Sequence, residues 1–161
     1  MRTVLLVCHA NTCRSVMAHV LLEKMLAERR ADDRVLVRSG GIANHARDGM
    51  IPSLEARIVL REDGIHLAED AMASTDLRRH RDLIAGAHLI LTMTVQQKEM
   101  LGAYDEALGR PIFTLKEFAG EEGDINDPFQ QGEDRYRVCR DEIKRCLEKG
   151  VDRLLVTLSA L

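Results

Sequence analysis

Several common sequence signals are missing from this chain of 161 residues, and each absence makes one class of function less well supported. No run of 18 apolar residues occurs, so no membrane-spanning helix is expected. The net charge of −3, from 23 basic and 26 acidic residues, gives no support for binding nucleic acid or a membrane surface. Neither G-x-G-x-x-G nor G-x-x-x-x-G-K-[ST] is present, so neither common kind of nucleotide site is supported.

Targeting signals and disulfide patterns are missing as well. The N-terminus carries one arginine and then a short apolar strand instead of a secretory signal, so we expect a cytoplasmic protein. Four cysteines in such a chain are expected to be free thiols. There is no internal repeat, and the length predicts one domain over residues 1–161.

The most informative stretch is residues 7–15, which read V-C-H-A-N-T-C-R-S. An apolar, β-branched run over residues 4–7 precedes it, and apolar residues at helical spacing begin near Val16. This pattern predicts a strand, a short loop and a helix N-terminus. Such a loop directs free backbone N–H groups and the positive end of a helix dipole at one point, which suits an anion.

The side chains of this loop fit a phosphoryl group. Arg14 can bind two phosphoryl oxygens at once, and Cys8 can act as a nucleophile when it is a thiolate. Backbone N–H groups, a helix N-terminus and the Ser15 hydroxyl all favour that thiolate. Two alternatives remain: a buried Cys8 that merely ends a core strand, and a zinc site from Cys8, His9 and Cys13. The zinc site lacks a second ligand pair downstream.

Strands alternate with helical segments along the chain, which predicts an α/β fold. We expect a single doubly wound domain with a four-stranded parallel sheet and helices on both faces. The phosphate loop then lies at the carboxyl end of the first strand, where such folds bind ligands. The predicted strands are residues 3–8, 35–37, 88–93 and 111–115, and the predicted helices are 14–30, 52–64, 75–85, 95–101 and one from 133 with a potential break at Gly150.

A loop rich in glycine and acidic residues follows the last strand and reads G-E-E-G-D-I-N-D-P-F over residues 120–129. Asp127-Pro128 within it is consistent with an ordinary turn closed by a capping aspartate. It also places a carboxyl group where a general acid would be needed, because a leaving atom requires a proton as its bond to phosphorus breaks.

At these residues the sequence resembles the low-molecular-weight protein phosphatase family. The family motif V-C-x-G-N-x-C-R-S-P stands here as V-C-H-A-N-T-C-R-S-V, so Ala10 replaces a glycine and Val16 replaces a proline. Alanine adopts positive φ less freely than glycine, which predicts a strained or altered loop. The family also carries a histidine that braces the loop through its Asn, where this chain has Glu69 and Asp70.

The resemblance implies a protein phosphatase that works through a cysteinyl-phosphate intermediate, with no metal and no organic cofactor. Cys8 would attack phosphorus, Arg14 and backbone N–H groups would hold the oxygens, and Asp127 would protonate the leaving group and then activate water. The implied partners are a phosphorylated protein and a phosphate or other oxyanion. Residues expected to bind substrate or phosphate are His9, Ala10, Asn11, Thr12, Cys13, Ser15 and Phe129, and Cys13 is also the expected redox partner of Cys8.

Thr12 and Phe129 resemble the bacterial protein-arginine phosphatase branch, because tyrosine-directed members often carry an apolar residue and a tyrosine there. A threonine hydroxyl can accept a hydrogen bond from a guanidinium. Asp127 and Asp124 are expected to make the site edge acidic. The alternatives are a tyrosine phosphatase of this family, a non-catalytic phosphoprotein-binding module, and an arsenate reductase, whose extra redox thiols would be Cys139 and Cys146.

Overall fold

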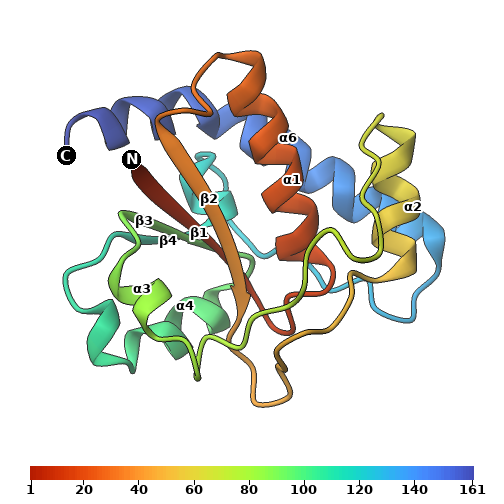
Figure 1. The fold of residues 1–161 in the computed structure, drawn as a ribbon, viewed down its shortest axis with the longest axis horizontal. Helices are drawn as coiled ribbons and strands as arrows, with labels where there is room; N and C mark the ends of the chain where they lie inside the picture. The colour runs from red at the N-terminus through yellow and green to blue at the C-terminus, as the bar shows by residue number, and fades with distance from the viewer.

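The computed structural model describes residues 1–161 and contains one sheet of four strands (Figure 1). The strands follow the order β2-β1-β3-β4, and every neighbouring pair is parallel. The predicted four-stranded parallel sheet is therefore confirmed. The strands are β1 (Arg2–Cys8), β2 (Val35–Gly41), β3 (Leu89–Thr92) and β4 (Ile112–Thr114).

Helices cover both faces of this sheet, as a doubly wound fold requires (Figure 1). One face packs against α1, α2, α5 and α6, and the other packs against α3, α4 and a short 3-10 helix. Their bounds are α1 (Arg14–Glu28), α2 (Leu54–Glu62), α3 (Asp82–Ala85), α4 (Val95–Gly102), the 3-10 helix η1 (Asp105–Ala107), α5 (Leu115–Phe118) and α6 (Glu133–Ser159).

Strand β1 lies in the middle of the sheet and is buried on both sides. Val4 and Leu6 face the larger apolar core under α1 and α6, whereas Leu5 and Val7 face the smaller core. All four side chains are fully buried, which explains why the strand reads as a continuous apolar run. The strand ends at Cys8, so the core fixes the position of the sulfur.

Helix α6 is continuous from Glu133 to Ser159, so the predicted break at Gly150 is wrong. Gly150 instead allows a close approach, because a Cβ at this position would lie 3.0 Å from Cδ2 of Phe118 in α5. The last turns of α6 thus pack beside α5, and Val151, Leu154 and Leu158 are buried in the larger core.

The segment between β2 and β3 differs from its prediction. Residues 75–81 are not helical, and only Asp82–Ala85 form a helix. The non-helical part runs beside the end of β2, where Asp76 forms a bridge with Gly41. Sequence periodicity missed this arrangement because the segment is held by a tertiary contact and has no regular pattern of its own.

Helix α2 spans Leu54–Glu62, so it is shorter than the predicted helix over residues 52–64. Ala56, Val59 and Leu60 form its buried face, whereas Leu54 is 57% exposed. Because the helix begins only at Leu54, Ile51 belongs to the preceding loop, where it is 51% exposed.

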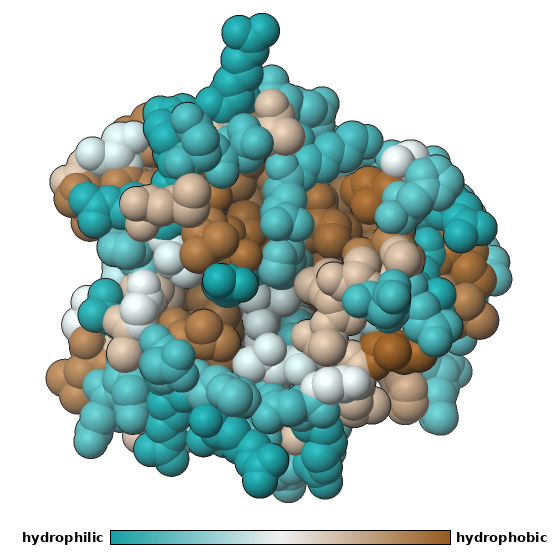
Figure 2. Space-filling model, in the orientation of Figure 1, coloured by the Kyte–Doolittle hydropathy of each residue, from teal (hydrophilic) through white to brown (hydrophobic).

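The surface in the orientation of Figure 1 is mixed. Figure 2 shows hydrophilic residues along the upper and lower parts of this face and hydrophobic patches nearer its middle and right-hand edge. None of the helices combines the length and the apolar character that crossing a membrane requires.

Candidate active site

The loop between β1 and α1 forms an anion cradle at the carboxyl end of the central strand. The backbone N–H groups of His9, Ala10, Thr12 and Cys13 donate to no acceptor within the protein. Helix α1 begins directly afterwards, so its positive end adds to these donors. Gly41 lets the end of β2 lie close against the loop, because a Cβ at this position would be only 2.6 Å from the carbonyl oxygen of His9.

Asn11 braces the loop through its backbone and its side chain. Its φ of 60° lies in the left-handed region, which asparagine tolerates better than most residues. The side-chain amide donates to Oγ of Ser15 over 2.7 Å, and Oδ1 accepts the backbone N–H of Thr75 at 2.9 Å. Thr75 thus braces Asn11 in a chain that lacks the family histidine. Ala10 has no positive φ, so the expected strain at this substitution is not found.

Two donors converge on the sulfur of Cys8, which is only 3% exposed. The backbone N–H of Asn11 points at Sγ over 3.3 Å, and Oγ of Ser15 lies 2.9 Å from it. Because Ser15 Oγ already accepts a hydrogen bond from Asn11, its own hydrogen is free to point at the sulfur. Two hydrogen-bond donors thus surround the sulfur at the base of the cradle.

Arg14 joins the phosphate loop to the Asp127 loop. It is 2% exposed, donates through Nη1 to the carbonyl oxygen of Ile125 over 2.7 Å, and places Nη2 3.7 Å from Oδ2 of Asp127. The Asp127 side chain is 46% exposed, and its Oδ1 accepts the backbone N–H of Phe129 at 3.1 Å. The structure thus brings Cys8, Arg14 and Asp127 to one site, with the carboxyl group at its open side.

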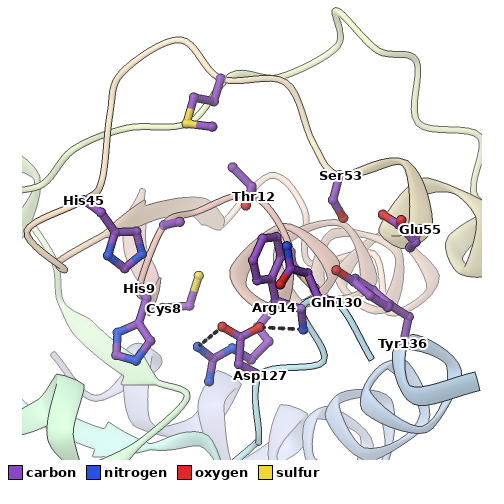
Figure 3. Close-up of a pocket in the computed structure, with 14 residues that line it drawn as sticks. Cys8, His9, Thr12, Arg14, His45, Ser53, Glu55, Asp127, Gln130 and Tyr136 are labelled. Atoms are coloured by element: carbon purple, nitrogen blue, oxygen red, sulfur yellow. Dashed lines mark hydrogen bonds and ion pairs between the residues drawn. The ribbon is translucent and has the colours of Figure 1, made fainter. Parts of the chain in front are cut away.

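These residues line a cavity of about 310 Å³, which Figure 3 shows in close-up. His9 and His45 lie on one side of Cys8, and their ring centroids are 6.3 Å apart. Burial and the nearby charge of Arg14 hold the pKa of His9 below its usual range, so this imidazole is neutral at pH 7. Thr12 and Phe129, which the sequence analysis expects to bind substrate, also line the cavity.

The opposite wall contains three residues that sequence reasoning missed: Ser53, Glu55 and Tyr136. Burial raises the pKa of Tyr136 to about 12, and the charge of Glu55 acts in the same direction. The tyrosine therefore stays protonated near neutral pH. The only local signal for this wall was Ser53 after a proline, which marks a helix start and says nothing about a cavity.

Asp124 does not belong to the site, which corrects the prediction that it makes the edge acidic. Its Oδ1 accepts the backbone N–H of Val95 over 3.0 Å at the start of α4, and it does not line the cavity. The acidic residues of the wall are Asp127 and Glu55. Asp124 lies close to Asp127 in the sequence, but its side chain binds the first N–H group of α4 and does not face the cavity.

All four cysteines are unpaired. Cys13 lines the cavity, and burial raises the pKa of its thiol. Cys139 and Cys146 are buried on α6, and burial raises the pKa of Cys139 to about 12. The two α6 thiols thus stay protonated within the core.

The chain resembles known phosphatases along nearly its whole length. The family described as low molecular weight phosphotyrosine protein phosphatase matches residues 3–158. A protein-arginine-phosphatase of Geobacillus stearothermophilus is 37% identical, covering 94% of this chain and 95% of that protein. The low molecular weight protein-tyrosine-phosphatase PtpB of Staphylococcus haemolyticus is 36% identical, covering 81% and 84%. The solved YwlE arginine phosphatase of G. stearothermophilus superposes with a TM-score of 0.81 at 35% identity, covering 97% and 94%.

Proposed function

We propose that this chain, which belongs to the low molecular weight phosphotyrosine protein phosphatase family, hydrolyses phosphoarginine side chains of proteins. Membership of the family makes it a cysteine-dependent protein phosphatase, and the substrate is the part that we infer. The observation that carries the inference is the hydroxyl of Thr12 in the cavity wall beside the phosphate cradle. Similarity to protein-arginine-phosphatases supports it.

The chemistry that we propose uses the three residues gathered at the site. The Cys8 thiolate attacks phosphorus, and the bond between phosphorus and the leaving nitrogen breaks as Asp127 gives that nitrogen a proton. The free loop N–H groups and Arg14 hold the three phosphoryl oxygens. Asp127 then takes a proton from water, whose oxygen attacks the cysteinyl phosphate and releases inorganic phosphate and the thiolate.

Selection between substrates must come from the walls, because phosphoarginine and phosphotyrosine present the same terminal oxygens to the cradle. A phosphorylated guanidinium needs acceptors, and Thr12 offers a hydroxyl oxygen at the edge of the loop. Phe129 offers a face for a planar group, and 63% of this residue is exposed. The Phe129 ring would also pack against the ring of phosphotyrosine, which is therefore the second candidate substrate. Similarity to the protein-tyrosine-phosphatase PtpB supports this second candidate.

The deciding experiment compares hydrolysis of phosphoarginine and phosphotyrosine peptides by one preparation. We expect the larger kcat/KM for phosphoarginine. A Cys8→Ser preparation made in parallel controls for contaminating phosphatases. A higher kcat/KM for phosphotyrosine at matched peptide sequence would overturn the substrate assignment while leaving the cysteine mechanism intact.

The four free cysteines are relevant to the cellular compartment in which the protein acts. Four unpaired cysteines, one of them the nucleophile that we propose, persist most readily in a reducing compartment. We infer that the phosphatase acts on phosphoproteins of the cytoplasm.

A further inference from the structure

We propose that Glu55 is a specificity-determining residue that binds a cationic side chain of the protein substrate. The inference rests on the proposed function, because it assigns part of the substrate to one wall of the same cavity. Glu55 is half-buried in that wall. Its carboxylate takes part in no ion pair and no side-chain hydrogen bond of the protein.

Glu55 is held at a fixed place relative to the phosphate cradle. The backbone N–H of Ser53 donates to the carbonyl oxygen of Thr12 over 2.9 Å, which attaches the start of α2 to the loop. The Ser53 side chain then caps α2 by accepting the N–H of Ala56 at 3.2 Å. Glu55 is thus two residues from a direct contact with the cradle, in the first turn of a capped helix, where the helix dipole stabilises its negative charge.

A second anchor holds the other end of α2. Glu62 pairs with Arg137 of α6 at 2.7 Å and with Arg140 at 2.8 Å, and Arg140 also donates to the carbonyl oxygen of Val59 over 2.7 Å. These contacts join α2 to α6, and α6 contributes Tyr136 to the same wall of the cavity as Glu55.

The charges of the cavity are distributed unequally. Figure 3 shows His9 and His45 on one side of Cys8, whereas Glu55 lies on the other side. Two carboxylates line the cavity, and Asp127 already has Arg14 at 3.7 Å. Glu55 lacks any such cation. A positive group that enters with the phosphorylated residue is therefore attracted toward the Glu55 wall.

The nearest basic residue in the sequence does not neutralise this carboxylate. Arg57 is two positions along α2, and its Nε points at the carbonyl oxygen of Pro52 over 3.4 Å. Residues two apart on a helix do not face each other, so Arg57 has no position from which to pair with Glu55. The carboxylate is consequently available to a group from outside the protein.

The cation that Glu55 binds is a guanidinium or an ammonium group, and it can come from two places in a substrate. One source is the phosphorylated arginine itself, whose guanidinium retains N–H donors after phosphorylation. The other is an arginine or lysine beside the phosphorylated residue in the polypeptide. Both sources supply the same hydrogen-bond donors to a carboxylate, and a substrate panel can separate them.

The test compares wild type with Glu55→Gln, which keeps the shape and removes the charge. Glu99→Gln is the matched control, because Glu99 is an exposed, unpaired glutamate of α4 outside the cavity. Three substrates are used: a phosphoarginine peptide without other cations, and two phosphotyrosine peptides that carry either arginine or alanine beside the phosphorylated residue. Steady-state kcat and KM are measured at low and at moderate salt.

We expect Glu55→Gln to raise KM by about 3- to 10-fold for substrates that bring the cation, with the smaller effect at higher salt. A loss on the phosphoarginine peptide identifies the phosphorylated side chain as the source. A loss of the preference for arginine over alanine in the phosphotyrosine pair identifies the neighbouring residue. Glu99→Gln should change neither quantity, and Glu55→Lys should invert the arginine-over-alanine preference.

If Glu55→Gln alters neither the phosphoarginine KM nor the arginine-to-alanine ratio, the proposal is wrong. The phosphotyrosine pair keeps this result separate from the substrate assignment, because it probes Glu55 even in an enzyme that does not act on phosphoarginine. An equal loss in all three substrates would also overturn the proposal, since it would indicate a structural role without charge selection. Thermal melting of each variant identifies such a structural loss.

Discussion

Arg14 donates to the carbonyl oxygen of Ile125 over 2.7 Å and so connects two loops that are 111 positions apart in the sequence. Its second terminal nitrogen stays within 3.7 Å of Asp127. One buried guanidinium thereby sets the position of the proposed general acid and also faces the anion cradle. Replacement of Arg14 by lysine should lower kcat by about 10²- to 10³-fold, because an ammonium cannot hold two oxygens and the loop together. The measurement is steady-state kinetics, with the exposed Arg79→Lys as control.

Cys8→Ser should abolish turnover while phosphate or vanadate binding remains measurable. The nucleophile and the anion cradle are separate features of this loop, because the donors belong to the backbone and to Arg14. Isothermal titration with vanadate measures the binding, and a sensitive phosphate-release assay measures the turnover. Ordinary turnover by the serine variant would refute the cysteinyl-phosphate mechanism.

Asn11→Ala should destabilise the protein and slow catalysis together. The variant loses the bonds to Ser15 and Thr75 and places alanine, which tolerates a left-handed backbone less well than asparagine, at a φ of 60°, for a cost of about 1–3 kcal/mol in unfolding free energy. Asn11→Gly separates the two causes, because glycine accepts the positive φ but also lacks the side-chain bonds. If both variants keep wild-type kcat, the brace does not orient Ser15 toward Cys8.

Mild peroxide should produce a reversible Cys8–Cys13 disulfide. Peroxide oxidises the Cys8 thiolate to a sulfenic acid, and the Cys13 thiol then displaces water from it. The raised pKa of Cys13 keeps it as a thiol, so the second step should quicken as the pH rises. Peptide mapping reports the product, and Cys139→Ser should behave as wild type. Mapping that finds only over-oxidised Cys8 beside an intact Cys13 would count against the pair.

Thr12→Ile should reduce the preference for phosphoarginine over phosphotyrosine. The change removes a hydroxyl acceptor from the wall and adds apolar surface that suits an aromatic ring. A lost hydrogen bond to a charged group is worth roughly 1.5–3 kcal/mol, or about 10- to 150-fold in kcat/KM for phosphoarginine. The readout is the ratio of the two specificity constants. An unchanged ratio would mean that Thr12 does not select the substrate.

Local sequence was enough to predict the parts of the fold whose pattern lies within one element. The apolar run before Cys8 indicated a buried central strand, and the sequence also indicated the long helix that begins at Glu133. The four-residue helix α5 was missed. It is held by a capping box in which Thr114 and Glu117 bond to each other's backbone, and it is too short for periodicity to reveal.

The amino-acid sequence by itself determined the content of the phosphate loop, because a nucleophile, backbone donors and an arginine within seven consecutive residues must come to the same place. It did not determine what surrounds that loop. Thr75 reaches Asn11 only because residues 75–81 run beside β2, and Glu55 reaches the cavity only because Ser53 bonds to Thr12. These contacts join segments far apart in the chain, so packing of the whole sheet and its helices had to bring them together before either residue could acquire a function.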